Sequence, residues 1–104
     1  MESKFANLDS IIHSRVRLPI IILLLQSKTA DFTYLKKEIG VSNGNLSTHL
    51  RKLEEAKYIE VQKSFENSKP KTTISLTDRG RDALNEYTKN LEEYLRLASK
   101  AKKS

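Results

Sequence analysis

The residues best suited to recognising another molecule lie in the stretch VSNGNLSTHLRKL, residues 41–53. Leucines recur there at i, i+4 and i+7, which predicts a helix that buries one stripe. The opposite side carries small or polar residues first and long cations later: Gly44, Asn45, Thr48, Arg51 and Lys52, with Ser47 at the edge. Amides and hydroxyls pair with base edges, and arginine and lysine reach guanine or phosphate. This side has the chemistry of a nucleic-acid contact; a merely solvated polar face is the alternative.

The same helix begins with residues that form helices poorly. Asn43, Gly44 and Asn45 have low helix propensity, whereas Ser42 before them is a good N-cap. The stability of the helix is therefore expected to come from its leucine stripe and its cap. We interpret residues 43–45 as placed for close approach to a partner.

A second helix is predicted just before this one, in TADFTYLKKEIGVS. It has three apolar residues on one face and a choice of two N-caps: Phe32, Leu35 and Ile39, with Asp31 or Thr33. Gly40 is placed to end it in a left-handed turn. Since only residues 40–42 separate the two helices, the pair has the spacing of a helix-turn-helix.

After residue 57 the hydrophobic period changes from helical to alternating. The patterns around Ile59 and Ile74 each predict a half-buried strand, and residues 63–71 between them read as a polar loop. The loop carries Lys63, Lys69 and Lys71, so the hairpin has a basic tip.

Two terminal helices are expected to flank these elements. Phe5, Leu8 and Ile12 have helical spacing, and the apolar run at residues 18–25 predicts a buried helix in which Pro19 lies in the first turn or makes a bend. At the other end, Thr77 is an N-cap for a helix of about six turns. Its seam at alternating spacings of three and four is typical of a helix pair: Leu84, Tyr87, Leu91, Tyr94, Ala98 and Ala101.

Length and composition limit the function. The chain has 104 residues, which suits one domain, residues 1–104, and its net charge of +6 favours a polyanionic partner, nucleic acid before an anionic membrane surface. It has no cysteine, no secretory signal and no apolar run long enough for a membrane span. A soluble, cytoplasmic protein is expected.

Nothing in the sequence indicates catalysis. His13 and His49 are the only histidines, and without cysteine they make no metal site; no Ser/His/acid set or phosphate-binding glycine loop is present. We expect no metal, no cofactor and no enzymatic activity, with His49 packed or contacting phosphate.

In this order the elements resemble the winged-helix regulators of the MarR and ArsR kind. The residues that carry the resemblance are SRVRLPIIILLL, FTYLKKEIGVSNGNLSTHLRKLEEAKYIEV and LTDRGRDAL. It implies an α+β, mainly α fold: a helix-turn-helix at about 32–56, a β-hairpin wing at about 58–76 and a long C-terminal helix. Lys57 departs from the family, which commonly has glycine there, so either Lys57 adopts a left-handed conformation or the helix exits differently.

The resemblance implies a homodimer that binds double-stranded DNA sequence-specifically, with the helix at about 43–56 in the major groove. Repression by promoter occlusion is preferred over activation. The expected DNA contacts are Ser42, Asn43, Gly44, Asn45, Ser47, Thr48, Arg51 and Lys52, and in the wing, on the backbone or minor groove, Lys63, Lys69 and Lys71. The expected dimer interface comprises Phe5, Leu8, Ile12, Tyr87, Leu91, Tyr94 and Ala98, unless the terminal helices pack within one chain.

Other functions stay open. A winged helix can serve as a protein-interaction module without DNA binding, although the basic, small-residue face lacks the aromatic anchors of such surfaces. RNA binding is disfavoured because no aromatic stacking platform is evident. A dimer cleft could hold a small-molecule effector, which no residue identifies.

Overall fold

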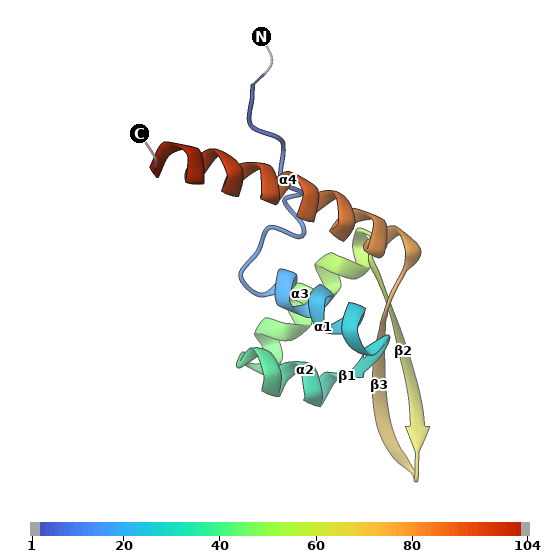
Figure 1. Cartoon of the computed structure of the whole chain (residues 1–104). Helices are drawn as coiled ribbons and strands as arrows, with labels where there is room; N and C mark the ends of the chain where they lie inside the picture. The colour runs from blue at the N-terminus through green and yellow to red at the C-terminus, as the bar shows by residue number, and fades with distance from the viewer. Residues whose placement is uncertain (1–2, 103–104) are drawn as a thin grey trace.

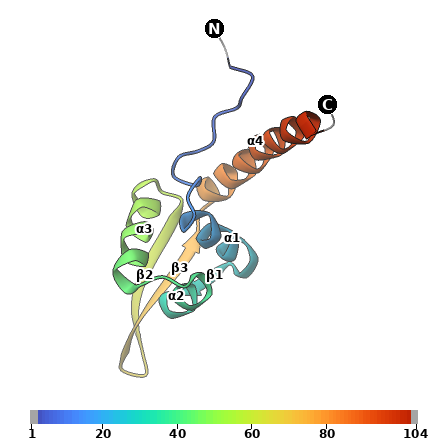
Figure 2. The same cartoon turned by 90° about the vertical axis from the view of Figure 1, so that its left-hand side faces the viewer.

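The computed structural model describes residues 3–102, and in that range the helices lie beside a small sheet whose hairpin extends away from them (Figure 1). The elements are α1 (Arg17–Ser27), β1 (Thr29–Asp31), α2 (Phe32–Ile39), α3 (Asn43–Glu55), β2 (Ile59–Glu66), β3 (Lys69–Leu76) and α4 (Asp78–Lys102). The predicted helix-turn-helix, hairpin wing and long C-terminal helix are all confirmed. Figures 1 and 2 show the wing and α4 extending from the body in different directions.

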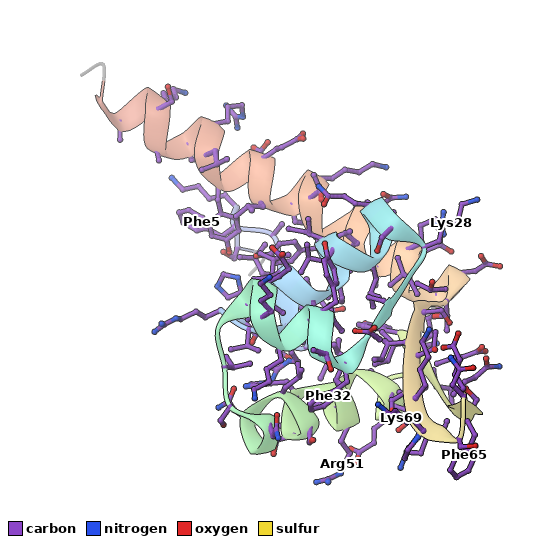
Figure 3. The ribbon with its side chains drawn as sticks, turned by 90° about the horizontal axis from the view of Figure 1, so that it is seen from below. Phe5, Lys28, Phe32, Arg51, Phe65 and Lys69 are labelled. Atoms are coloured by element: carbon purple, nitrogen blue, oxygen red, sulfur yellow. The ribbon has the colours of Figure 1, made fainter. Side chains whose placement is uncertain are left out.

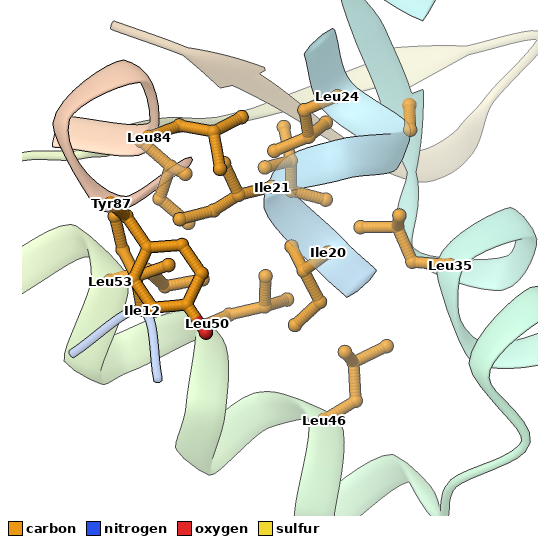
Figure 4. Packing of buried hydrophobic residues seen from close by; sticks show 13 residues of the cluster. Ile12, Ile20, Ile21, Leu24, Leu35, Leu46, Leu50, Leu53, Leu84 and Tyr87 are labelled. Carbon is orange, nitrogen blue, oxygen red and sulfur yellow. The ribbon is translucent and has the colours of Figure 1, made fainter. Parts of the chain in front are cut away.

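The core lies where α1 crosses α3 (Figure 4). The predicted stripe of α3 is buried there, with Leu46 and Leu53 fully inaccessible to solvent. Pro19 falls in the first turn of α1, where its missing N–H is tolerated. The apolar run after it is helical as expected, but only one side is buried, because Ile22 and Leu25 remain 39% and 41% exposed.

The sheet is antiparallel with the order β1-β3-β2. Its edge strand β1 was not predicted: it has only three residues and pairs Ala30 with Ile74. The strands of the wing also run further than expected, because the segment expected as a loop is paired as far as Glu66 and Lys69. A two-residue turn closes the hairpin, and both of its residues have positive φ, 52° at Asn67 and 62° at Ser68, as in a type I′ turn.

The expected helix through Phe5, Leu8 and Ile12 is wrong. Residues 3–9 contain no helix or strand and run beside α4, where the Tyr94 hydroxyl donates to the Ala6 carbonyl over 2.7 Å. The Phe5 and Tyr94 rings lie 5.6 Å apart. The helical spacing was misleading because α4 supplies hydrogen bonds and apolar contacts that a helix would otherwise have to provide.

Asp9 ends this segment and fixes it to the body. Its carboxylate accepts from the backbone N–H of Ile11 over 2.8 Å and also from the Tyr58 hydroxyl. Burial, followed by the hydrogen bond to Asp9, raises the pKa of Tyr58 to about 12. The hydroxyl therefore stays protonated and keeps donating at neutral pH.

Lys57 takes the left-handed conformation, with φ of 66°. The Tyr58 N–H donates to the Leu53 carbonyl and the Lys57 N–H to that of Glu54, which is the Schellman ending of a helix. Lys57 is thus held in a conformation that glycine adopts more easily, at a cost of about 1 kcal/mol.

The start of α4 is joined tightly to the end of α3. The Thr77 hydroxyl donates to the Lys57 carbonyl over 2.7 Å and accepts from the Gly80 N–H over 3.0 Å. Arg79 donates to the Ala56 carbonyl over 3.1 Å. A Cβ at Gly80 would lie 2.2 Å from the Tyr58 carbonyl oxygen, so only glycine permits this approach.

Within residues 3–102, no helix combines the length and the apolar character that crossing a membrane requires.

Candidate nucleic-acid interface

The turn between α2 and α3 sets the direction of α3. Asp31 caps α2 by accepting from the Tyr34 N–H over 2.7 Å, which decides between the two expected caps. Gly40 ends that helix with φ of 76°. Ser42 then caps α3 by accepting from the Asn45 N–H over 3.1 Å. Each of these roles follows from local residue chemistry, and together they place the start of α3 at the surface.

The polar side of α3 is open to solvent along the helix. Every residue expected to touch DNA from this element is exposed: Ser42, Asn43, Gly44, Asn45, Ser47, Thr48, Arg51 and Lys52. At Gly44 an added Cβ would meet no atom within 4 Å. The packing of the fold therefore does not require glycine at this position, in contrast to Gly80. The absence of a side chain lets another molecule approach the backbone closely.

Thr48 presents a particular set of groups. Its hydroxyl donates to the Gly44 carbonyl over 3.0 Å within the helix. Because the donor is used, Thr48 offers outward a methyl group and oxygen lone pairs, which suit the thymine methyl and the amino groups of bases.

Arg17 holds α3 from inside the body. This residue is only 9% exposed, and its guanidinium donates to the Ile11 carbonyl over 2.6 Å and to Nδ1 of His49 over 2.8 Å. Burial, then the charge of Arg17, then that of Lys52 lower the pKa of His49 below its ordinary value. His49 is therefore a packed residue, one of the two roles expected for it, and it links the middle of α3 to α1.

The three wing lysines do not lie on one face. Directly paired residues share a side of the hairpin, so Lys63, opposite Thr72, lies on one face, and Lys69 and Lys71 lie on the other. Lys63 lines a groove with Ser47 and Arg51 of α3. Lys71 is paired with Glu66 at 2.8 Å, which raises the pKa of Lys71. Lys63 is thus the wing cation that lies beside α3.

Two surface residues near this site were not predicted. Arg15 lines a hollow with Ser42 and Asn45, a neighbourhood that arises only because the segment before α1 packs beside the turn. Phe65 in the wing is 79% exposed (Figure 3). The sequence held a signal for its position. If the alternating pattern had been continued beyond Val61, Lys63 and Phe65 would have been assigned to the strand, on the same face as Val61.

The structure divides the residues expected at a dimer interface. Ile12 and Tyr87 are 0% and 3% exposed within one chain, so they belong to its own core and are not open to a partner. Leu8, Leu91 and Tyr94 are half-buried, and Phe5 and Ala98 are exposed. Leu95, which was not in the expected set, is 61% exposed on the projecting part of α4.

Comparisons with known proteins agree with this architecture. Residues 16–95 match the family model described as a winged helix DNA-binding domain. An uncharacterised protein of Methanocaldococcus jannaschii is 40% identical over 77 residues, which cover 74% of this chain and 84% of that protein.

Solved structures have the same fold. A transcriptional regulator homologue from Pyrococcus horikoshii has a TM-score of 0.78 at 29% identity and covers 83% of this chain and 85% of its own. A protein assigned to the MarR family of transcriptional regulators from Enterococcus faecalis has a TM-score of 0.76 at 20% identity, with 91% and 86% covered. At 20% identity, the Enterococcus faecalis structure supports the fold alone. This is the fold that the sequence resemblance implies.

Proposed function

Because this chain belongs to the winged helix DNA-binding domain family, we propose that it is a transcriptional regulator that binds double-stranded DNA sequence-specifically through the exposed side of α3. The observation that carries the proposal is Gly44. It lies in the first turn of α3, exposed, where the fold leaves space for a side chain. Helix-turn-helix proteins read bases with this part of the helix, and a missing side chain lets the backbone approach the major groove closely.

The cations further along α3 would hold the protein to the DNA backbone. Arg51 and Lys52 are exposed in the second half of α3, and Lys63 of the wing lines a groove together with Arg51. Two arms with cations on either side of a groove suit the two phosphate strands that border a DNA groove. Lys69 and Lys71, on the other face of the wing, would act through their charge or on a neighbouring phosphate.

We further propose that the protein acts as a homodimer through α4 and the segment beside it. Leu91, Leu95 and Ala98 follow one another at spacings of four and three, and this part of α4 projects from the body (Figure 1). Two copies related by a two-fold axis would place two α3 helices on one side of the DNA. Occlusion of a promoter by such a dimer makes repression the simplest action.

Selection from a random pool of duplexes, with purified protein as bait, tests this proposal. Enrichment of a sequence with two-fold symmetry is expected, and log affinity for that duplex should fall steeply and linearly with log salt as counterions are released. Selection that enriches no sequence, combined with a flat salt response, would overturn DNA binding and favour a protein-interaction module on the same scaffold.

A further inference from the structure

The tip of the wing carries an apolar side chain that the fold does not use. Phe65 is 79% exposed, the highest value among the large hydrophobic residues of the described chain. It lies directly opposite Pro70. Counting from the two-residue turn, this pair is the non-hydrogen-bonded kind, in which side chains lie closest and the missing N–H of proline is not needed by the partner strand. Phe65 and Pro70 therefore form one apolar unit, called here the tip pair.

The tip pair lies on the same face of the hairpin as the residues that meet α3. Side chains alternate along β2, so Ile59, Val61, Lys63 and Phe65 share a face. Ile59 is buried in the core, and Val61 and Lys63 line the groove beside Ser47 and Arg51. Figure 3 shows the side chains of Arg51 and Phe65 extending from the same edge of the molecule.

The separation along the strand fits the spacing of DNA grooves. Phe65 is four positions after Val61, which lies beside α3, and four positions span about 13 Å in a strand. Adjacent major and minor grooves are offset by roughly half a helical turn, about 17 Å. With α3 in the major groove, the strand from Val61 to Phe65 spans most of this offset, and the groove between α3 and Val61 adds to the separation of α3 from the tip pair.

Charge around the tip favours DNA over a protein partner. Residues 63–71 contain three lysines and one glutamate, a formal charge of +2. The single acid, Glu66, is paired with Lys71 on the face away from Phe65. An apolar side chain on the same face as Lys63, in a segment of net positive charge, suits the minor groove, whose walls are apolar sugar faces bordered by phosphates.

We propose that Phe65, backed by Pro70, makes an apolar contact in the minor groove of duplex DNA while Lys63 contacts the adjoining phosphate. This inference rests on the proposed function and adds to it a contact whose strength does not depend on charge. Burial of most of a phenyl ring corresponds to roughly a tenfold change in affinity or more.

The test compares wing variants of the full chain on the duplex recovered by the wild-type selection, at several salt concentrations. Phe65→Thr keeps a strand-favouring residue but removes the apolar ring, and about tenfold weaker binding is expected at every salt concentration. Phe65→Leu, which keeps an apolar group, should bind within about threefold of the wild type. Lys63→Ala is the matched control for charge, with a salt slope smaller by about 1.

The outcomes separate the two proposals. Hydroxyl-radical footprinting of the wild type should show a protected stretch of minor groove beside the major-groove contact. This minor-groove protection should be lost in Phe65→Thr. If Phe65→Thr binds the duplex as tightly as the wild type, or if its salt slope differs from that of the wild type, the tip contact is overturned. The proposed function would be unaffected by either result. Absence of any duplex that the wild type binds would overturn the proposed function itself at the first step. Circular dichroism and thermal unfolding of each variant establish that the hairpin and core are unaltered.

Discussion

Arg17 in α1 donates through its guanidinium to Nδ1 of His49 in α3 over 2.8 Å. Arginine has donors only, so Nδ1 must accept, and the imidazole is neutral with its proton on Nε2. Because the same guanidinium also donates to the Ile11 carbonyl, one buried cation ties the segment before α1 to the middle of α3.

The first prediction is that this contact makes stability depend on pH. Burial, Arg17 and Lys52 lower the pKa of His49 in the folded chain below the value of 6.5 of a free histidine. Below pH 6.5 the unfolded chain therefore binds more protons than the folded one, so the contribution to stability is full above that pH and declines as the pH falls. Urea unfolding at pH 7.5 and pH 5.5 measures the decline. His49→Gln, whose amide oxygen can still accept from Arg17, should lose less stability over this range; an equal loss would remove His49 as its source.

Two glycines in helices should respond to alanine in opposite ways. Gly80→Ala brings a methyl group against the Tyr58 carbonyl and a Leu76 side chain, so the free energy of unfolding should fall by about 2 kcal/mol. Gly44→Ala has open space and better helix propensity, and stability should rise by up to about 0.5 kcal/mol. Affinity for the selected duplex should nonetheless drop in Gly44→Ala. If that variant is both more stable and fully active in binding, the backbone at Gly44 does not approach DNA.

Arg51 of α3 is expected to contact a DNA phosphate. Arg51→Ala should weaken binding to all duplexes by a similar factor and reduce the slope of log affinity against log salt by about 1. Arg96→Ala removes the same charge from α4, where Arg96 is paired with Glu93 and is not among the residues expected to contact DNA. Titration of both variants by fluorescence anisotropy makes the comparison, and equal slopes would show that only net charge matters.

Leu95 offers a cleaner test of the dimer than residues that also pack on the core. It is 61% exposed, so Leu95→Asp should leave the folded chain intact while placing a charge in the proposed interface. Sedimentation at micromolar concentration should show the mass of one 11.9 kDa chain for this variant and twice that for the wild type. Asn85→Asp, an exposed change on the same helix, should sediment like the wild type. An unaltered mass for Leu95→Asp would place the interface elsewhere.

The parts of the fold that could be predicted from sequence depend on neighbouring residues. Ser42 caps α3, Gly40 ends α2 and the leucine stripe is buried, because capping, left-handed turns and helical periodicity are set within one or two turns of chain. The exposure of Gly44 and Thr48 followed directly from that stripe, so the centre of the candidate site was accessible from the pattern alone.

The parts that could not be predicted depend on contacts distant in sequence. The segment around Phe5 follows α4 because of Tyr94, and β1 exists because β3 is there to pair with it. Arg15 is brought to the start of α3 only by the packing of the segment before α1 beside the turn. None of these leaves a local pattern, and the spacing of Phe5, Leu8 and Ile12 imitated one.

Gly80 lies close to Tyr58, and the Thr77 hydroxyl donates to the Lys57 carbonyl. These two contacts hold the end of α3 firmly against the start of α4. Tilting one helix would require the other to follow, so these contacts fix the angle between α3 and α4. In the proposed homodimer, α4 would then set the distance between the two α3 helices. A DNA site whose two half-sites lie at a different spacing would have to twist or bend to be bound. The deformability of base steps that the protein does not contact would then influence which sites are bound.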